Sequence, residues 1–366
     1  MIARLRFMGL VSLALIVFAT TGCRTPSRVG QIAPRRGDEI VVAGRLVHTG
    51  TPVVTWLDPG GYDGYRVERR FAPLEAADWE PSRAAVKELT TPNRYGMRRS
   101  PVLSNDVERL RGGGWDLSTL QKVVDQVVVH YDACGTSRQC FKVLHDLRGL
   151  SAHFLLDLDG TIYQTLDVKE RAWHATTSNS RAVGIEIAHP GAYPPGRVDP
   201  LAEWYRPEEG GRIRVTIPPR FGDGGLRTPN FKGYTARPKL VTGAIHGREV
   251  AQYHFTPEQY RALTHLMAAL CRVFPRLKCD YPRDASGRLI TRALTEAELE
   301  NASLVVGHFH IQANKVDPGP AFQWDTVIEG ARRLLAPGRG AAGPPPPKGA
   351  ALLLRGACAP QSAPPK

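Results

Sequence analysis

Residues 127–131 read Val-Val-Val-His-Tyr, a continuous apolar run of β-branched residues that ends in a histidine and a tyrosine. A second run of this kind, Ala-Val-Gly-Ile-Glu-Ile, occupies residues 182–187. Short apolar runs rich in β-branched residues are typical of strands buried in the middle of a sheet. We therefore expect both segments to be buried strands, with the rest of the fold arranged around them.

Between these two strands, the sequence predicts a helix and a β-hairpin. Residues 141–150 carry apolar side chains at helical spacing. Residues 153–158 and 161–164 are strand-like, and the Asp159-Gly160 pair between them favours a tight hairpin turn.

Further along the chain, residues 256–259 read Thr-Pro-Glu-Gln, which is typical of the start of a helix. We expect that helix to end at Pro275. A short strand at 304–307 and a last helix at 325–335 follow. Strands and helices therefore alternate, with one local hairpin. The fold class we expect is α/β, with a mixed central β-sheet flanked by helices.

The composition is that of a soluble globular protein. The chain has 366 residues, of which 42% are hydrophobic and 23% are charged. This balance excludes a disordered chain, a coiled coil and a protein with many membrane spans. Basic residues number 48 against 35 acidic ones, which gives a net charge of +13. Such an excess favours a polyanionic partner, such as nucleic acid, a membrane surface or an acidic polymer.

The first 22 residues have the layout of a secretory signal: Arg4 and Arg6, then an apolar run at 8–19, then a short polar end. Cys23 follows a small residue directly, as in bacterial lipoprotein signals, where the cysteine is lipidated and becomes the first mature residue. The alternative is an ordinary cleaved signal followed by an incidental cysteine. In either case the protein leaves the cytoplasm for a compartment in which disulfides are permissible.

After the signal, composition divides the chain into three parts. Residues 23–117 have little periodicity, and we expect a linker and an N-terminal subdomain there. Residues 118–336 contain the regular elements and form the main domain, with an insertion at about 190–250. The segment 212–239 of this insertion has seven basic residues and one acidic residue. Residues 337–366 are rich in Pro, Gly and Ala, and we expect a flexible tail.

Four cysteines of the main domain form two close pairs. Cys134 and Cys140 are six residues apart, which is too wide for a redox Cys-x-x-Cys motif, and Cys271 and Cys279 are eight apart. Two short-range disulfides are one arrangement that these spacings allow. The sequence does not determine the connectivity.

Two histidines and an aspartate lie where strands are expected to end. His130 is near the end of the first strand, His308 follows the strand at 304–307, and Asp317 comes nine residues later. Two imidazoles and a carboxylate at strand ends can bind a metal ion and leave a fourth position open for water. A single histidine at a strand end more often has only a structural role, so spacing alone supports the site moderately.

Five segments resemble, in the same order, the zinc-dependent N-acetylmuramoyl-L-alanine amidases of the peptidoglycan-recognition superfamily. The resemblance is to the branch with a His, His, Asp zinc site, which includes periplasmic lipoprotein amidases and muropeptide-recycling amidases. The matching segments are VVVHYDA (127–133), SAHFLLDLDGTIYQTLD (151–167), RAWHA (171–175) followed by Asn179, AVGIEIAHPG (182–191) and GHFHIQANKVDPGPAFQW (307–324).

Carried over onto these positions, the resemblance implies that His130, His308 and Asp317 bind Zn²⁺. It implies that Glu186 is the general base or proton shuttle. It implies that Lys315 polarises the scissile carbonyl and stabilises the oxyanion. The fold implied is the peptidoglycan-recognition amidase type, with an N-terminal extension and a Pro-rich tail. The activity implied is hydrolysis of the amide between N-acetylmuramic acid and the L-alanine of the stem peptide.

The resemblance carries further expectations. His174 and Asn179 occupy positions that line the substrate groove, and a short disulfide like Cys134–Cys140 recurs in animal relatives. The partners implied are peptidoglycan or muropeptides and, through lipid on Cys23, a membrane. We expect a periplasmic monomer that binds no nucleic acid. Because Arg24 rather than an aspartate follows the cysteine, we expect attachment to the outer membrane.

The main alternative is a non-catalytic protein that binds peptidoglycan in the same groove. Relatives of that kind lose at least one metal ligand, whereas this chain keeps all three together with Glu186 and Lys315. A nucleic-acid-binding protein would interleave aromatic and basic residues, and the chain has no such motif. The basic insertion is better explained by stem-peptide carboxylates or by an anionic envelope surface. His310 either supports a metal ligand or is a plain loop histidine.

Overall fold

The computed structural model describes residues 35–65 and 95–336. The expected signal at 1–22, Cys23 and the tail at 337–366 lie outside the described residues. Within the described ranges, no helix has the length and apolar character needed to cross a bilayer.

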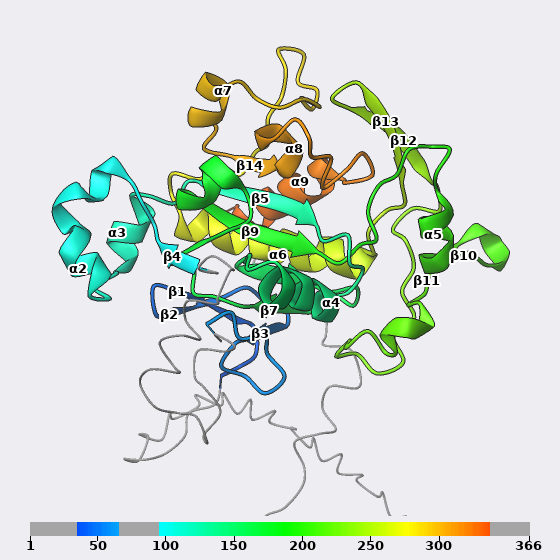
Figure 1. Cartoon of the computed structure of the whole chain (residues 1–366), viewed down its shortest axis with the longest axis horizontal. Coiled ribbons are helices and arrows are strands. Elements are labelled where there is room, and N and C mark those ends of the chain that lie inside the picture. Colours follow the sequence, from blue (N-terminus) through cyan, green and yellow to red (C-terminus); the bar gives the residue numbers. More distant parts are fainter. Residues whose placement is uncertain (1–34, 66–94, 337–366) are drawn as a thin grey trace, which may run out of the picture. The chain divides into compact units, whose positions relative to one another are not determined.

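A mixed sheet of six strands forms the centre of the fold (Figure 1). In order across the sheet, the strands are β14 (Val305–Gly307), β5 (Gln126–Tyr131), β9 (Ala182–Ile187), β6 (Phe154–Leu156), β7 (Ile162–Gln164) and β3 (Val53–Thr55). All neighbouring pairs are parallel except the β6–β7 hairpin, which is antiparallel. This confirms the mixed sheet and the Asp159-Gly160 hairpin expected from the sequence.

The register of the strands aligns chemically important residues in one row. His130 on β5 lies opposite Glu186 on β9, which lies opposite Leu155 on β6. The last residue of β14, Gly307, pairs with Val129 of β5. The next residue of each segment is a histidine, so His308 lies beside His130. Because side chains alternate between the two faces of a sheet, residues paired in register project from the same face. The row therefore brings two histidines and a glutamate together at the carboxyl ends of parallel strands.

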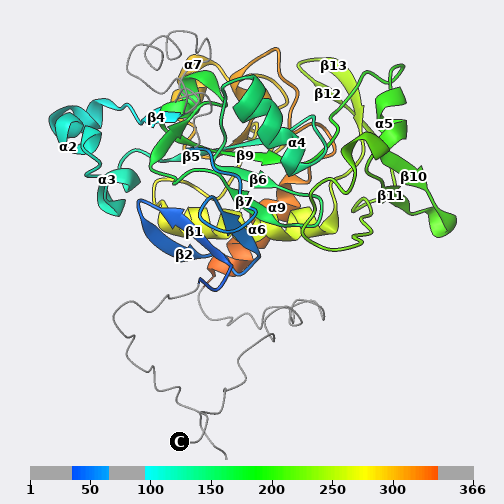
Figure 2. The ribbon, with the colours of Figure 1, turned by 60° about the horizontal axis from the view of Figure 1, so that its bottom comes forward.

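Helices α6 (Pro257–Val273) and α9 (Trp324–Leu335) cover the opposite face of the sheet (Figure 2). Thr256 caps α6 as expected: its side chain accepts the Gln259 N–H, and the Gln259 side chain accepts the Thr256 N–H. Full burial of a large aliphatic side chain stabilises the fold by about 1.5–3 kcal/mol. The core between sheet and helices includes Val127, Val129, Phe154, Leu156, Val183, Ile185, Ile187, Leu263, Leu266, Met267, Leu270, Val327 and Ile328.

On the face that carries His130 and Glu186, α4 (Ser137–Phe141) and a π-helix (Lys142–Leu147) pack over β6 and β7. The helix expected at 141–150 was wrong at both ends. It begins four residues earlier because the Thr136 side chain caps it by accepting the Gln139 N–H. It ends before Gly149, whose positive φ of 62° is typical of the residue after a helix.

The N-terminal region contributes to the same core. β3 is the edge strand of the central sheet, and Ile40, Val42 and Val53 lie in the core beneath α6. The sheet therefore extends across the domain boundary expected between residues 117 and 118. The other elements of this region are β1 (Glu39–Val42), β2 (Arg45–His48), β4 (Tyr95–Met97), a 3-10 helix (Pro101–Asp106), α2 (Val107–Arg111) and α3 (Leu117–Gln121).

The insertion has secondary structure and a small core of its own, built around Leu201, Trp204, Tyr205 and Ile213. Its elements are α5 (Asp199–Trp204), β10 (Tyr205–Pro207), a 3-10 helix (Glu209–Gly211), β11 (Ile213–Val215), a 3-10 helix (Pro219–Phe221), β12 (Val241–Ile245) and β13 (Arg248–Gln252). The rest of the main domain has β8 (Glu170–Ala172), which pairs with β4, a 3-10 helix (Thr176–Ser180), α7 (Glu296–Glu300) and α8 (His308–Ile311).

Candidate functional site

Three side chains converge at the end of the row described above. His130 Nδ1 lies 3.0 Å from His308 Nδ1 and 2.8 Å from Asp317 Oδ2, and His308 Nδ1 lies 3.0 Å from the same oxygen. All three residues are buried. Ligand atoms bound to one tetrahedral zinc ion are separated by roughly 3.4 Å. The three atoms are therefore close to the spacing that a shared metal ion requires.

In His130 and His308, the Nε2 atom, which does not face the cluster, has a partner of its own. His308 Nε2 donates to Gln312 Oε1 at 2.7 Å, and His130 Nε2 faces His174 Nδ1 at 3.0 Å. With the proton of each neutral ring on Nε2, both Nδ1 atoms direct lone pairs at each other and at the Asp317 oxygen. Three acceptors that face one point without a proton between them fit a cation.

The electrostatics of the cluster favour the protonation states of metal ligands. Burial and the neighbouring His308 lower the pKa of His130 to about 4. Burial alone would raise the pKa of Asp317, but its close contacts with His130 and His308 bring it below its usual range. Neutral imidazole and ionised carboxylate are the forms that bind a metal ion. The residues present therefore fit Zn²⁺ with three protein ligands.

His174 and Asn179 lie behind the metal cluster. The Asn179 side-chain oxygen accepts the backbone N–H groups of His174 and Ala175, at 3.1 and 2.7 Å. The His174 ring lies over Gly184 of β9, where an added Cβ would come within 2.7 Å of the ring. The structure thus gives both residues a role in orienting His130. Their contact with substrate stays a prediction.

Glu186 projects from the row beside His130. Its side chain is 8% exposed, and no hydrogen bond or ion pair to its carboxylate forms within the described ranges. Burial raises the pKa of Glu186 well above its ordinary value, and the carboxylates of Asp317 and Asp132 raise it further. A carboxylate with a raised pKa suits a group that takes and returns a proton near neutral pH.

Lys315 lies in the loop that joins α8 to Asp317. Its positive charge acts on both His130 and Glu186, where it lowers the pKa of each side chain. Its backbone N–H donates to the Gln312 carbonyl at 3.1 Å. The ammonium group is therefore near enough to the cluster to influence charge there, as the resemblance implies.

His310 and His153 are buried and do not join the cluster. The ring of His310 accepts the Gly307 N–H through Nδ1 and donates to the Ile290 carbonyl at 2.7 Å. It therefore braces the start of α8, next to His308. His153 accepts the Gly184 N–H, and burial lowers its pKa to about 3.

A cleft of about 580 Å³ lies beside the loop that follows His130, and the cluster residues themselves do not line it. The loop that follows His130 forms one wall, and α5 with the neighbouring segment of the insertion forms another. The lining includes Asp132, Cys134, Tyr193, Trp204 and Arg220. This cleft therefore has a mixed polar and aromatic lining, and the loop after His130 connects it to the cluster along the chain.

The four cysteines of the described region are free thiols. Burial and the neighbouring Cys134 thiol raise the pKa of Cys140, and the neighbouring Cys279 thiol raises the pKa of Cys271. The structure thus brings together each pair expected from the sequence. Disulfide formation stays a prediction.

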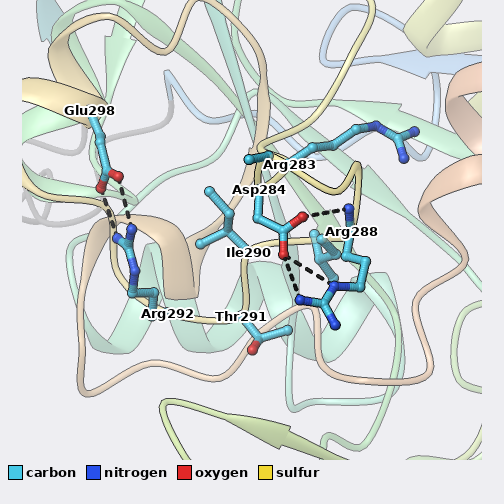
Figure 3. A pocket seen from close by; sticks show the side chains of 9 residues that line it. Arg283, Asp284, Arg288, Ile290, Thr291, Arg292 and Glu298 are labelled. Atoms are coloured by element: carbon cyan, nitrogen blue, oxygen red, sulfur yellow. Dashed lines mark hydrogen bonds and ion pairs between the residues drawn. The ribbon is translucent and has the colours of Figure 1, made fainter.

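A second hollow, of about 720 Å³, lies on the segment 283–292, which contacts His310 through Ile290 (Figure 3). Ion pairs cross its rim: Arg288 with Asp284 at 3.2 Å and Arg292 with Glu298 at 2.7 Å. These pairs neutralise most of the charge of the hollow. They also fix the segment that supports α8.

Sequence reasoning missed two residues that hold the site. Gln312, the residue directly after α8, orients His308, and the four-residue spacing between them is a signal that could have revealed it. His246 contacts the carbonyl of Lys315 from the insertion, 69 residues away along the chain. No local pattern signals such a contact.

Comparison with known proteins agrees with this geometry. A family profile described as N-acetylmuramoyl-L-alanine amidase matches residues 120–320, which is more than half of the chain. No sequence among the curated proteins matched the chain.

Among solved structures, a selenomethionine derivative of AmpD is 17% identical, with 75% of this chain and 98% of that chain covered and a TM-score of 0.30. AMPDH3 from Pseudomonas aeruginosa, in complex with anhydromuramic pentapeptide, is 18% identical, with coverages of 57% and 59% and a TM-score of 0.30. AmiD from E. coli, in complex with the substrate anhydro-N-acetylmuramic acid-L-Ala-D-gamma-Glu-L-Lys, is 18% identical, with 57% of both chains covered and a TM-score of 0.31. The assignment rests on the family match and on the metal cluster. The chain belongs to the N-acetylmuramoyl-L-alanine amidase family, and its buried His130, His308 and Asp317 form the zinc site typical of these hydrolases.

Proposed function

We propose that this protein hydrolyses the amide bond between the lactyl group of N-acetylmuramic acid and the L-alanine of the peptidoglycan stem peptide. The observation that carries the proposal is the buried cluster of His130, His308 and Asp317, with Glu186 beside it on one row of the sheet. Hydrolysis of an unactivated amide at neutral pH needs a metal centre and a group that moves protons.

Each residue of the site has a distinct role in this proposal. Zinc in the cluster supplies a Lewis acid that makes water more acidic. Glu186 accepts the proton of the attacking water and returns it to the L-alanine nitrogen as the C–N bond breaks. Lys315 places positive charge near the carbonyl oxygen while negative charge develops there. The products are a carboxylate on the muramic acid and a stem peptide with a free amine.

The cleft beside the loop after His130 supports a muropeptide as the substrate. The half-buried ring of Tyr193 suits a sugar ring, and peptide carboxylates need cationic partners. Two basic residues of the insertion are already paired, Arg214 with Glu208 and Arg220 with Glu203. The remaining basic residues of the insertion are the better candidates for stem-peptide carboxylates or for an anionic envelope surface.

The test is incubation of the mature protein with purified sacculi and with soluble muropeptides, followed by mass analysis of the products. We expect release of stem peptides that begin with L-alanine, loss of that activity with a chelator, and recovery on addition of zinc. Asp317→Ala is the matched control and should release no peptide. Retention of the wild-type protein on sacculi without any cleavage would instead identify the non-catalytic binding protein.

We also propose that the mature protein is a monomer held in the periplasm by lipid on Cys23, at the outer membrane. The signal-like residues 1–22 and Arg24 support this proposal. Cys23→Ser should move the protein from the membrane fraction to the soluble fraction. A mature N-terminus other than Cys23 in the native protein would indicate an ordinary cleaved signal instead.

A further inference from the structure

The turn of the β12–β13 hairpin contains an unusual residue for its conformation. His246 and Gly247 form the two-residue turn, with φ values of 53° and 71°. Turns of this kind need positive φ at both positions and most commonly use Asn-Gly. A histidine in the first position therefore suggests that its side chain has a function beyond the turn.

The hairpin contacts the loop that carries Lys315. His246 Nδ1 accepts the backbone N–H of Ala293 at 3.2 Å, so the ring proton is on Nε2. Nε2 then donates to the Lys315 carbonyl at 3.0 Å. On the other side of the turn, Arg248 donates to the Ala313 carbonyl at 2.8 Å. Two side chains of the insertion thus hold two carbonyl groups of one short loop.

The turn is itself anchored to the segment 283–292. The backbone N–H of His246 donates to the Thr291 carbonyl at 2.8 Å. The neighbouring Ile290 carbonyl accepts from His310, within α8. Figure 3 shows the two arginine–carboxylate pairs that brace this segment around Ile290 and Thr291. His246 therefore lies between a braced segment and the Lys315 loop.

The loop has few other contacts near its centre. Its ends are held by the Lys315 N–H bond to the Gln312 carbonyl and by the Phe309 N–H bond to the Asp317 carbonyl. Ala313 and Asn314 are exposed. The Lys315 carbonyl is therefore a point at which one side-chain hydrogen bond can fix the direction of the lysine.

We propose that His246 is a positioning residue for Lys315: the insertion holds the loop so that the ammonium group faces the reacting carbonyl. This inference rests on the proposed function of the same site. Misplacement of a charged group by about 1 Å can cost roughly 100-fold in rate, whereas substrate binding in the cleft does not depend on it. The hydrogen bond should therefore affect kcat and leave KM unchanged.

The test compares two substitutions of His246. His246→Asn suits the positive φ at least as well, so the hairpin should keep its stability, but its amide cannot reach the Lys315 carbonyl. We expect about a 10–100-fold lower kcat with unchanged KM, zinc content and Tm. His246→Gln places an N–H where Nε2 was and should restore much of the rate. Glu249→Gln, exposed on the same hairpin, is the control and should have the wild-type rate.

A double mutant separates positioning from a general structural role. Lys315→Met should be slow, and His246→Asn combined with Lys315→Met should be no slower, because both changes remove the same interaction. If the double mutant lost kcat by the product of the two single effects, the proposal would be overturned. A wild-type kcat for His246→Asn would also overturn it. A fast Lys315→Met enzyme would instead refute the role of Lys315.

A measurement independent of activity completes the test. Amide hydrogen exchange in the zinc-loaded protein should be faster across residues 312–317 in His246→Asn than in the wild type, and unchanged in Glu249→Gln. Equal exchange in His246→Asn and wild type would overturn the inference even if the protein cleaved no peptidoglycan.

Discussion

Substitution of His174 by alanine tests how the protein holds its first zinc ligand. His174 Nδ1 lies 3.0 Å from His130 Nε2, and His130 is 2% exposed. Alanine leaves the buried His130 N–H without its acceptor, which costs about 1–3 kcal/mol. Loss of an outer partner of a metal ligand typically weakens metal binding by about 10–100-fold, or about 1.4–2.7 kcal/mol. Because the two estimates agree, we expect the zinc Kd of His174→Ala to rise about 10–100-fold.

The assay is competition for zinc between the protein and a coloured chelator at neutral pH. His174→Asn keeps an acceptor near the position of Nδ1 and should bind zinc nearly as tightly as the wild type. Gly184→Ala should weaken binding in the same direction as His174→Ala, because the new Cβ would lie 2.7 Å from the His174 ring. His254→Ala removes a buried histidine that contacts Gln323 outside the site and serves as the control.

Two results would refute this reasoning. The first is a His174→Ala protein that binds zinc as tightly as the wild type, since the His130–His174 contact would then have no effect on the ligand. The second is a His254→Ala protein that loses as much affinity, since the effect would then be a general loss of stability.

Three further predictions follow from the site and its surroundings. Glu186→Gln and Lys315→Met should keep zinc and sacculus binding, with turnover reduced about 10²–10⁴-fold and 10²–10³-fold, respectively; a wild-type rate in either would remove that residue from the mechanism. Burial raises the pKa of Asp157 to about 8, so its contribution to the unfolding free energy is fully present below about pH 4 and is lost as pH rises towards 8. Asp157→Asn should flatten this dependence in chemical denaturation, and an identical pH profile would contradict the assignment. In the oxidising periplasm proposed for this protein, an envelope thiol–disulfide oxidoreductase should oxidise Cys271 and Cys279 to a disulfide; free thiols that can be alkylated without prior reduction would contradict this.

Local patterns were enough to predict the strands and the metal cluster. The run at 182–187 matches β9 residue for residue, and the Thr256 cap marks the start of α6. His130 is predictable as a candidate site residue because it ends a strongly apolar strand, where a polar side chain is costly unless it has a role. The role of Glu186 depended on the resemblance. Position along the chain placed Asp317 with the two histidines as a candidate ligand, and the resemblance then identified it as the third one.

Contacts between distant segments could not be read from the sequence. β3 joins the sheet by pairing with β7, although more than a hundred residues separate them. The insertion also supplies His246 and Arg248, which contact carbonyl groups of the loop before Asp317. Such contacts depend on tertiary packing and carry no periodic signal. The early start of α4 could have been predicted from the sequence. Thr136 is a residue type typical of helix N-caps, but the prediction used only the spacing of apolar residues.

The central claim is that His130, His308 and Asp317 bind one zinc ion. Crystals of the zinc-loaded protein, measured on both sides of the zinc absorption edge, test it most directly. We predict a single anomalous peak about 2.0–2.2 Å from His130 Nδ1, His308 Nδ1 and an Asp317 carboxylate oxygen, with Glu186 nearby but not a ligand. A peak elsewhere, or zinc bound through Nε2 of either histidine, would contradict the account.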